Sequence, residues 1–259
     1  MTKLSERFVP GVIVAQKAWS DELRSLYVTA PIEPFVAGQF TQLSLDEEVA
    51  LFRPYSFVNA NDQSPLEFYY SILPTGKFTQ QLARLKPGDR LFVAKRASGR
   101  FVLETVPDAK VLWLFATGTG LGVFLSMLQT PLAWQRFQKV VLVHSVQKAS
   151  SLTHLDLVKH WQKQYGNQFY WIPTITGATP QSGILSQRIT ALLLEGYLEK
   201  IVECELSITT SQTMLCGNPA MVKDLSELLI QRGLQMNHPK HPGHITVENY
   251  WKLDNRETL

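Results

Sequence analysis

The stretch VLWLFATGTGLG, residues 111–122, decides the fold of the second half of the chain. Residues 111–116 are all apolar, which is typical of a strand buried on both faces of a parallel sheet. Gly118 and Gly120 follow directly, and residues 123–128 have the apolar composition of a helix. A glycine-rich turn between a buried strand and a helix is the context that a dinucleotide-binding loop needs, although the spacing is not the full G-x-G-x-x-G motif.

The same alternation continues towards the C-terminus. Strand patterns at residues 140–144, 169–175 and 213–216 alternate with helical patterns at 155–165, 186–194 and 221–232. This order predicts a doubly wound α/β domain with a parallel sheet. Cys216-Gly217-Asn218-Pro219 ends the last strand, at the edge where such sheets bind ligands. Cys216 is therefore either next to a bound nicotinamide or a small buried core residue.

The first hundred residues have a different character. Short strand patterns occur at residues 12–14, 23–28, 39–45, 57–58, 66–73 and 91–94, with turns at Arg53-Pro54 and at residues 86–89. Such strands, punctuated by glycine and proline, predict a small antiparallel β-barrel. One helix is expected at residues 78–85, with Phe78, Leu82 and Leu85 on one face. The boundary falls near residues 104–107, which gives a barrel domain at 1–105 and an α/β domain at 106–259.

Composition sets the broad class. The chain has 259 residues, 45% of them hydrophobic and 18% charged, as in an ordinary globular protein. The sequence begins with no secretory signal, it has two cysteines, and its apolar runs are too short for a membrane helix. We therefore expect a cytoplasmic protein without membrane contact, and nothing demands more than a monomer.

Two segments of the expected barrel suit a flat, anionic cofactor. Arg53-Pro54-Tyr55-Ser56 offers a cation, an aromatic face and a hydroxyl, which alternate between the two faces of an extended backbone. Residues 74–79, PTGKFT, precede the expected helix. A glycine there lets the backbone approach a ligand, and a helix N-terminus favours a pyrophosphate.

Taken together, these motifs resemble those of ferredoxin–NADP⁺ reductases of the bacterial ferredoxin/flavodoxin type. The stretches AGQFTQL, RPYSFVNA, LEFYYSILPTGKFTQQLARLKPGD, ATGTG, MLCGNP and PGHITVENYW carry the resemblance over most of the chain. It implies an oxidoreductase that binds FAD in the barrel domain and NADP(H) in the α/β domain. In that family a hydride passes between the nicotinamide and the flavin N5, and single electrons pass to the carrier protein.

The resemblance also implies roles for individual residues. Arg53 would contact the FAD pyrophosphate, Tyr55 the isoalloxazine and Ser56 its N5, with Tyr55, Ser56 and Cys216 as the catalytic group. The remaining FAD residues would be Pro54, Tyr69, Tyr70, Ser71, Ile72, Lys77, Phe78, Thr79, Thr119, Tyr250 and Trp251. The NADP(H) residues would be Gly118, Gly120, His144, Gln147, Lys148, Arg188, Gly217 and Asn218.

The chain departs from the family pattern in three places. Leu121-Gly122-Val123 stands where the family usually has a proline, and residues 252–259 extend past the usual terminal aromatic. Gln147 and Gly177 replace two arginines that hold the 2′-phosphate of NADP, while Lys148 and Arg188 keep basic character. NADP(H) is our leading expectation. An NADH-dependent flavin or oxygenase-feeding reductase on the same fold is the alternative.

A basic stretch, residues 77–100, indicates the protein partner. It carries a single acid, Asp89, and seven cations. The cations are Lys77, Arg84, Lys86, Arg90, Lys95, Arg96 and Arg100. Such a patch steers an acidic partner, here ferredoxin or flavodoxin. Nucleic acid is not expected, because stacking aromatics are not interleaved with the cations. His238, His241 and His244 do not predict a metal site, since prolines prevent a helical face and no further ligand is near.

Overall fold

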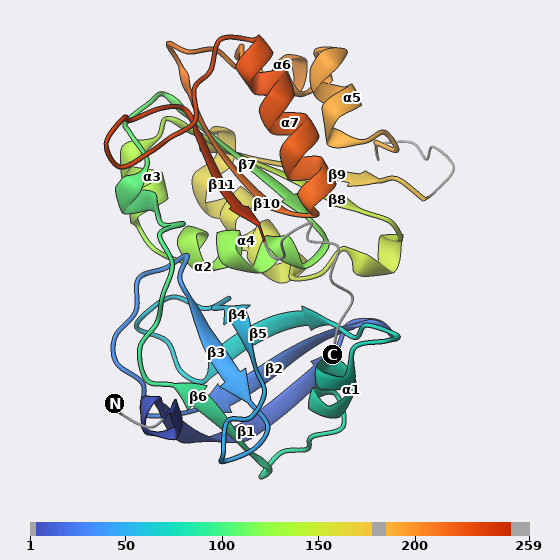
Figure 1. Cartoon of the computed structure of the whole chain (residues 1–259). Helices are drawn as coiled ribbons and strands as arrows, with labels where there is room; N and C mark the ends of the chain where they lie inside the picture. Colours follow the sequence, from blue (N-terminus) through green and yellow to red (C-terminus); the bar gives the residue numbers. More distant parts are fainter. Residues whose placement is uncertain (1–3, 178–184, 250–259) are drawn as a thin grey trace. The chain divides into compact units, whose positions relative to one another are not determined.

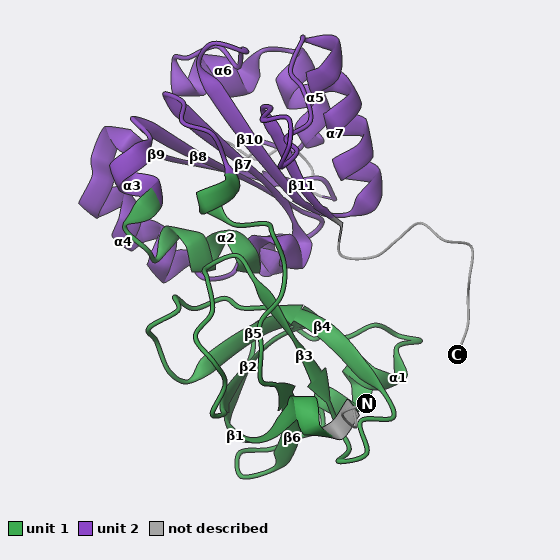
Figure 2. Ribbon diagram, turned by 60° about the vertical axis from the view of Figure 1, so that its left-hand side comes forward, with its two compact units in different colours: residues 1–105, 122–132 green, residues 106–121, 133–259 purple. Residues whose placement is uncertain are grey.

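A computed structural model describes residues 4–177 and 185–249. The chain divides into two compact units (Figure 2), which are Met1–Thr105 with Gly122–Leu132 and Val106–Leu121 with Ala133–Leu259. The segment Gly122–Leu132 therefore packs with the N-terminal unit, although it lies beyond the boundary near residues 104–107 that the sequence suggests. Within the described residues, no helix is both long and apolar enough to cross a lipid bilayer.

The first unit is a six-stranded antiparallel sheet with the order β4-β3-β6-β1-β2-β5. The two edge strands meet, because Val58 N–H donates to the Glu67 carbonyl at 3.0 Å beside a bridge between Phe57 and Phe68. The expected antiparallel barrel is thereby confirmed (Figure 1). Its elements are β1 (Phe8–Ala18), β2 (Leu23–Thr29), β3 (Phe40–Ser44), β4 (Phe52–Ser56), β5 (Leu66–Ser71), α1 (Lys77–Leu82) and β6 (Arg90–Ala94).

One expectation for the barrel is wrong. Arg53-Pro54 is not a turn before a strand at residues 57–58, because Arg53, Pro54, Tyr55 and Ser56 are themselves in β4. β4 is at the end of the strand order and forms a ladder with β3 alone. Proline cannot donate to a ladder, but an edge strand needs no donor on its open side. The Arg53-Pro54 pair, which we took to mark a turn, therefore marks an edge strand of the sheet.

The second unit is a five-stranded parallel sheet with the order β11-β10-β7-β8-β9. The expected α/β class is confirmed. The strands are β7 (Val111–Thr117), β8 (Lys139–Val146), β9 (Phe169–Ile175), β10 (Ser211–Gly217) and β11 (Ile245–Asn249). The helices are α3 (Leu132–Arg136), α4 (Leu155–Tyr165), α5 (Ile189–Leu194), α6 (Tyr197–Val202) and α7 (Pro219–Gln231), whereas α2 (Leu121–Leu128) belongs from Gly122 on to the first unit.

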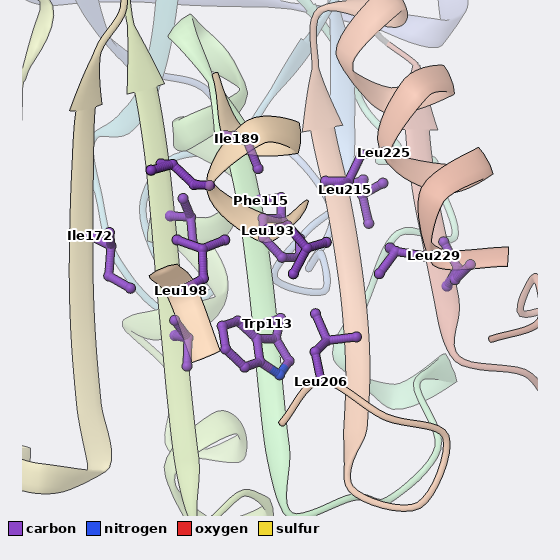
Figure 3. Close-up of a cluster of buried hydrophobic side chains, with 14 of the residues drawn as sticks. Trp113, Phe115, Ile172, Ile189, Leu193, Leu198, Leu206, Leu215, Leu225 and Leu229 are labelled. Atoms are coloured by element: carbon purple, nitrogen blue, oxygen red, sulfur yellow. The ribbon is translucent and has the colours of Figure 1, made fainter. Parts of the chain in front are cut away.

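The main core of the second unit lies between one face of this sheet and helices α5, α6 and α7 (Figure 3). Trp113 and Phe115 of β7 are fully buried there, and their rings are 6.2 Å apart and almost parallel. A second aromatic cluster surrounds Trp134, whose ring stacks on Tyr165 at 3.7 Å and packs edge-on against Phe169. Because both faces are covered, β7 and β8 are apolar almost throughout, as their sequences predict.

Candidate functional site

The carboxyl ends of β7 and β10 lie side by side in the second unit. β7 is followed in sequence by β8, which is its neighbour on one side, whereas β10 is its neighbour on the other. The order in which strands are added to the parallel sheet therefore reverses between β7 and β10, and ligands of open α/β sheets bind at such a switch point. Gly118 and Gly120 follow β7, and Gly217 ends β10, so the two expected glycine segments meet at this edge.

Glycine is required at two of these positions for lack of space. A Cβ on Gly120 would lie 2.6 Å from the Cys216 carbonyl oxygen. Gly217 has φ +130°, and a Cβ there would collide with the Thr117 hydroxyl oxygen. That oxygen also accepts a hydrogen bond from Asn218 N–H at 2.7 Å. The backbones of the two segments, which we call the glycine cradle, are thus in direct contact, and only glycine permits this approach at residues 120 and 217.

Helix α7 begins at the same edge. Asn218 is its N-cap and accepts a hydrogen bond from Ala220 N–H at 2.9 Å, and Pro219 occupies the first helical position. A 13-residue helix presents a positive dipole end and free amides to an anion. Asn218 therefore has a structural task, because it starts the helix that points its positive end at the cradle.

His144 stands behind the loop. Its side chain is 1% exposed, and Nε2 is 3.1 Å from the Gly118 carbonyl oxygen. Burial lowers the pKa of this imidazole to about 4, so it is neutral near pH 7 and its Nε2–H donates to that carbonyl. The side chain that we expected at the coenzyme thus holds the loop. Its direct contact with a coenzyme stays a prediction.

The expected phosphate-binding residues are spread over the ends of β8, β9 and α5. Gln147 and Lys148 are exposed after β8, and Arg188 is exposed as the N-cap of α5. Gly177 N–H donates to the Gln147 carbonyl at 3.0 Å, and a Cβ on Gly177 would collide with that same oxygen. Packing against Gln147 therefore requires a glycine at position 177. Of the expected phosphate-binding residues, the two with cationic side chains are Lys148 and Arg188.

Cys216 has a neighbour that the sequence did not single out. It is fully buried, and its thiol donates to Glu248 Oε2 at 3.9 Å across the β10–β11 pair. Burial raises the pKa of Glu248 to about 7. The signal that would have revealed Glu248 is its register in β11, an element that we did not predict.

The barrel unit carries the other group of site residues. Arg53 is exposed, whereas Tyr55 and Ser56 are half-buried. The Tyr55 ring lies against Phe78 at 6.1 Å and meets Tyr70 edge-on at 6.1 Å. Burial raises the pKa of the Tyr55 phenol above its usual value, so the ring is neutral. An aromatic face backed by rings, beside an exposed cation, is suited to a flat anionic ligand.

The residues expected on β5 divide between two faces. Tyr70 is 3% exposed and belongs to the barrel core, whereas Tyr69 is 6% exposed and lies beside Gly122 at the start of α2. Ser71 and Ile72 follow and are half-buried. Tyr70 therefore lies under Tyr55 as its support and offers little surface of its own.

The start of α1 has no side-chain cap. Gly76 is the N-cap, and a Cβ there would lie 2.7 Å from the Thr79 hydroxyl oxygen. That hydroxyl donates to the Gly76 carbonyl and accepts from Leu73 N–H, each at 3.1 Å. Thr79 thus closes the turn with its side chain. The exposed Lys77 remains to meet an anion, while Phe78 is buried.

Three expected FAD residues have not yet been placed, namely Thr119, Tyr250 and Trp251. Tyr250 and Trp251 lie outside the described residues. Thr119 is half-buried in the Gly118–Gly120 turn. Across residues 4–177 and 185–249, no three His, Cys, Asp or Glu side chains are grouped as metal ligands.

Comparison with known proteins gives one consistent result. The family described as "Oxidoreductase NAD-binding domain" matches residues 114–227. The flavodoxin/ferredoxin–NADP reductase of Escherichia coli is 42% identical over 246 residues, which cover 94% of this chain and 99% of the relative. The ferredoxin–NADP reductase of Pseudomonas aeruginosa is 31% identical over 89% of this chain and 92% of its own length.

A solved structure agrees with these relatives over nearly the same length. The ferredoxin NADP⁺ reductase of Neisseria gonorrhoeae, with bound FAD and NADP, superposes with a TM-score of 0.89. It is 32% identical and covers 95% of this chain and 99% of its own. The likeness therefore includes both units.

Proposed function

Because the chain belongs to the flavodoxin/ferredoxin–NADP reductase family, we propose that it is an FAD enzyme that passes electrons between NADP(H) and ferredoxin or flavodoxin. The observation that carries this proposal is the 42% identity over 94% of the chain, since it spans both groups of site residues. The physical features of each group support the assignment.

The barrel residues fit FAD. Arg53 and Lys77 are exposed cations for a pyrophosphate, and the half-buried ring of Tyr55 offers a face for the isoalloxazine. Glycine is required at residue 76, because a Cβ there would lie 2.7 Å from the Thr79 hydroxyl oxygen, so the N-cap of α1 carries no side chain. When bound, the flavin supplies the ability to exchange a hydride with a nicotinamide and single electrons with a carrier. The protein's own part is to bind and orient it.

The α/β residues fit a nicotinamide dinucleotide. Gly120 and Gly217 form a backbone-lined cradle, and the N-terminus of α7 adds a positive dipole end. Cys216 is the residue before the last in β10 at this edge, and we propose that it lies beside the nicotinamide. We assign Tyr55 and Ser56 to the flavin ring and Cys216 to the nicotinamide ring. Glu248 is assigned together with Cys216, because its carboxyl accepts from the Cys216 thiol.

NADP(H) is the proposed coenzyme, since the relatives are NADP reductases. Lys148 and Arg188 are the cations proposed for its 2′-phosphate. The second candidate, an NADH-dependent reductase, is favoured by one observation: Gln147 and Gly177 are neutral at the ends of β8 and β9. Without arginines at these two positions, the protein has fewer bidentate contacts with the 2′-phosphate and distinguishes NADP(H) from NAD(H) less strongly.

The carrier is proposed to dock on the basic stretch, residues 77–100. All seven cations of this stretch are exposed, and Arg96 forms an ion pair with Glu33 at 3.0 Å. An exposed positive surface speeds encounter with an acidic protein. We further propose that the enzyme acts as a monomer in the cytoplasm.

The test is a flavin titration followed by parallel stopped-flow reduction. We expect the purified protein to bind one FAD and to show a flavin absorbance spectrum. NADPH and NADH are then mixed separately with the loaded enzyme, and NADPH is expected to reduce it with the higher kcat/KM. A protein that takes up no FAD overturns the proposal. A strong preference for NADH supports the second candidate in its place.

A further inference from the structure

Strand β1 contains a bulge that changes which side chains face the barrel interior. Ile13 pairs with Val28 and Ala15 pairs with Tyr27, so Val14 is an extra residue without a partner position. Beyond the bulge Gln16 pairs with Leu26, and both Val28 and Leu26 are fully buried. Strict alternation from Ile13 would have turned Gln16 outward. A bulge re-aims the side chains that follow it, and here it turns an amide inward.

The amide of Gln16 joins two elements that are distant in sequence. Its Nε2 donates to the Leu82 carbonyl at 2.8 Å and to the Leu85 carbonyl at 3.0 Å. Its Oε1 accepts from the Tyr70 hydroxyl at 3.3 Å. Leu82 is the last residue of α1, and its carbonyl also accepts from Leu85 N–H at 3.3 Å in the turn that follows the helix. One side chain therefore closes the end of α1 and ties it to β5.

Both of these elements support the same ring. Tyr70 of β5 meets Tyr55 edge-on, with the rings at 88° to each other. Phe78 of α1 lies against Tyr55 with the rings at 29°. Tyr55 therefore lies against side chains of both β5 and α1, the two elements that the hydrogen bonds of Gln16 connect.

We propose that Gln16 is a positioning residue of the flavin site, which acts through Tyr70 and α1 to orient the ring of Tyr55. The proposal rests on the proposed function, because it takes Tyr55 to face the isoalloxazine. A purely structural role for Gln16 would lower the stability of the barrel without changing the environment of the bound flavin. The affinity for FAD and the visible circular dichroism of the flavin separate these two roles.

The experiment compares Gln16→Met, Tyr70→Phe and the double variant with wild type. FAD is titrated into each flavin-free protein, and the melting temperature is measured alongside. Gln16→Met loses all three hydrogen bonds, so we expect about tenfold weaker FAD binding and an altered visible band. Tyr70→Phe loses only one and is expected to weaken binding about threefold. In the Gln16→Met background, Tyr70→Phe should have no further effect, because their shared bond is already gone.

Gln129→Met is the matched control. Gln129 Nε2 also donates to two main-chain carbonyls, those of Val58 at 2.8 Å and Leu125 at 3.2 Å, within the same unit. We expect a lower melting temperature but FAD affinity within about twofold of wild type. The proposal is overturned if Gln16→Met keeps the wild-type affinity and visible band, or if Gln129→Met changes them equally. Should Gln16→Met not fold, an unchanged band in Tyr70→Phe overturns it. A wild type that takes up no FAD overturns the proposed function, and this proposal with it.

Discussion

The thiol of Cys216 donates to the carboxyl of Glu248 across two paired parallel strands, with Sγ 3.9 Å from Oε2. The two residues are in register, so their side chains lie on the same face of the sheet. Burial raises the pKa of Glu248 to about 7 from an ordinary value of 4.5. A carboxyl that changes charge near neutral pH thus lies beside a thiol at the carboxyl end of β10. Ionisable groups with such shifted pKa values are typical of functional sites.

We expect Glu248 to make the protein less stable as the pH rises. The folded protein keeps this proton up to about pH 7, whereas the unfolded chain loses it near pH 4.5. Folding therefore binds a proton between these values, and the free energy of unfolding falls as pH rises through them. In urea unfolding of the flavin-free proteins, the free energy of unfolding of wild type minus that of Glu248→Gln should fall as pH rises from about 4.5 to 7. The exposed Glu104→Gln control should follow wild type, and parallel profiles for Glu248→Gln and wild type would refute the prediction.

His144 should have the opposite effect. Its pKa is lowered to about 4 from 6.5, because the buried ring resists charging. The unfolded chain takes up this proton first, so stability is full above about pH 6.5 and is lost as pH falls towards 4. The difference corresponds to roughly 3 kcal/mol. His144→Gln keeps a donor for the Gly118 carbonyl but cannot titrate, and the same urea series should show its acid loss reduced. The exposed His160→Gln should leave the loss intact, and a wild-type profile in His144→Gln would contradict the expectation.

Glycine substitutions should separate backbone strain from close packing in the cradle. Gly120→Ala places a methyl group 2.6 Å from the Cys216 carbonyl oxygen, whereas Gly118→Ala meets nothing within 4 Å and suffers only from φ +52°. We expect a stability cost of about 1 kcal/mol for Gly118→Ala and more for Gly120→Ala. Coenzyme affinity, measured by calorimetry with NADP⁺, should fall by at least about tenfold for Gly120→Ala.

Gly196→Ala is the control for this pair. Gly196 also has a positive φ, +72°, with nothing within 4 Å, but it lies between α5 and α6. It should lose stability as Gly118→Ala does and bind NADP⁺ normally. Equal affinity in Gly120→Ala and wild type would show that the cradle tolerates the methyl group and that its packing is not required for binding.

Carrier reduction should depend on charge. Charge reversal at Lys86 and Arg90 should slow flavodoxin or ferredoxin reduction about tenfold at low salt, because it removes electrostatic steering. Added salt should slow wild type towards the variant, and flavin reduction by NADPH should not change. Lys159→Glu on α4 is exposed but lies outside the basic stretch and should match wild type. A wild-type rate that is flat with ionic strength would remove the basic stretch as the docking surface.

Local sequence patterns predicted most strands of the second unit and the glycine segments that follow β7 and β10, because those signals are contiguous. Residues 111–122 give β7, the turn and α2 directly. The pattern at Arg53-Pro54 was misread as a turn, since whether a proline is tolerated in a strand depends on the strand being at an edge. β11 was missed because Pro242 and Gly243 precede a short run whose partner, β10, lies 32 residues away.

The missed site residues have the same explanation. Glu248 is recognisable only through its register with Cys216, and Gln16 only through the bulge at Val14. The first depends on a pairing between residues 32 apart and the second on an irregularity in the pairing of β1 with β2, and no local periodicity encodes either. Gly177 illustrates a related limit, because the sequence shows an absent arginine but not the packing that excludes one.

The packing of Gly177 against Gln147 bears on the choice between NADP⁺ and NAD⁺. Arg188 is the exposed guanidinium proposed for the 2′-phosphate, so Arg188→Ala should weaken NADP⁺ binding about tenfold, the loss of a charge-assisted hydrogen bond. NAD⁺ binding should stay within about twofold, because it lacks that phosphate. Gln147→Arg should strengthen NADP⁺ selectively, since position 147 is exposed and a side chain there has space. Gly177→Arg should not, because its Cβ would collide with the Gln147 carbonyl oxygen and break the hydrogen bond between these two residues. Calorimetric titration of each variant with NADP⁺ and NAD⁺ measures all four effects. Equal losses for both coenzymes in Arg188→Ala would place this arginine away from the phosphate, and a selective gain in Gly177→Arg would show that the turn at 177 can open.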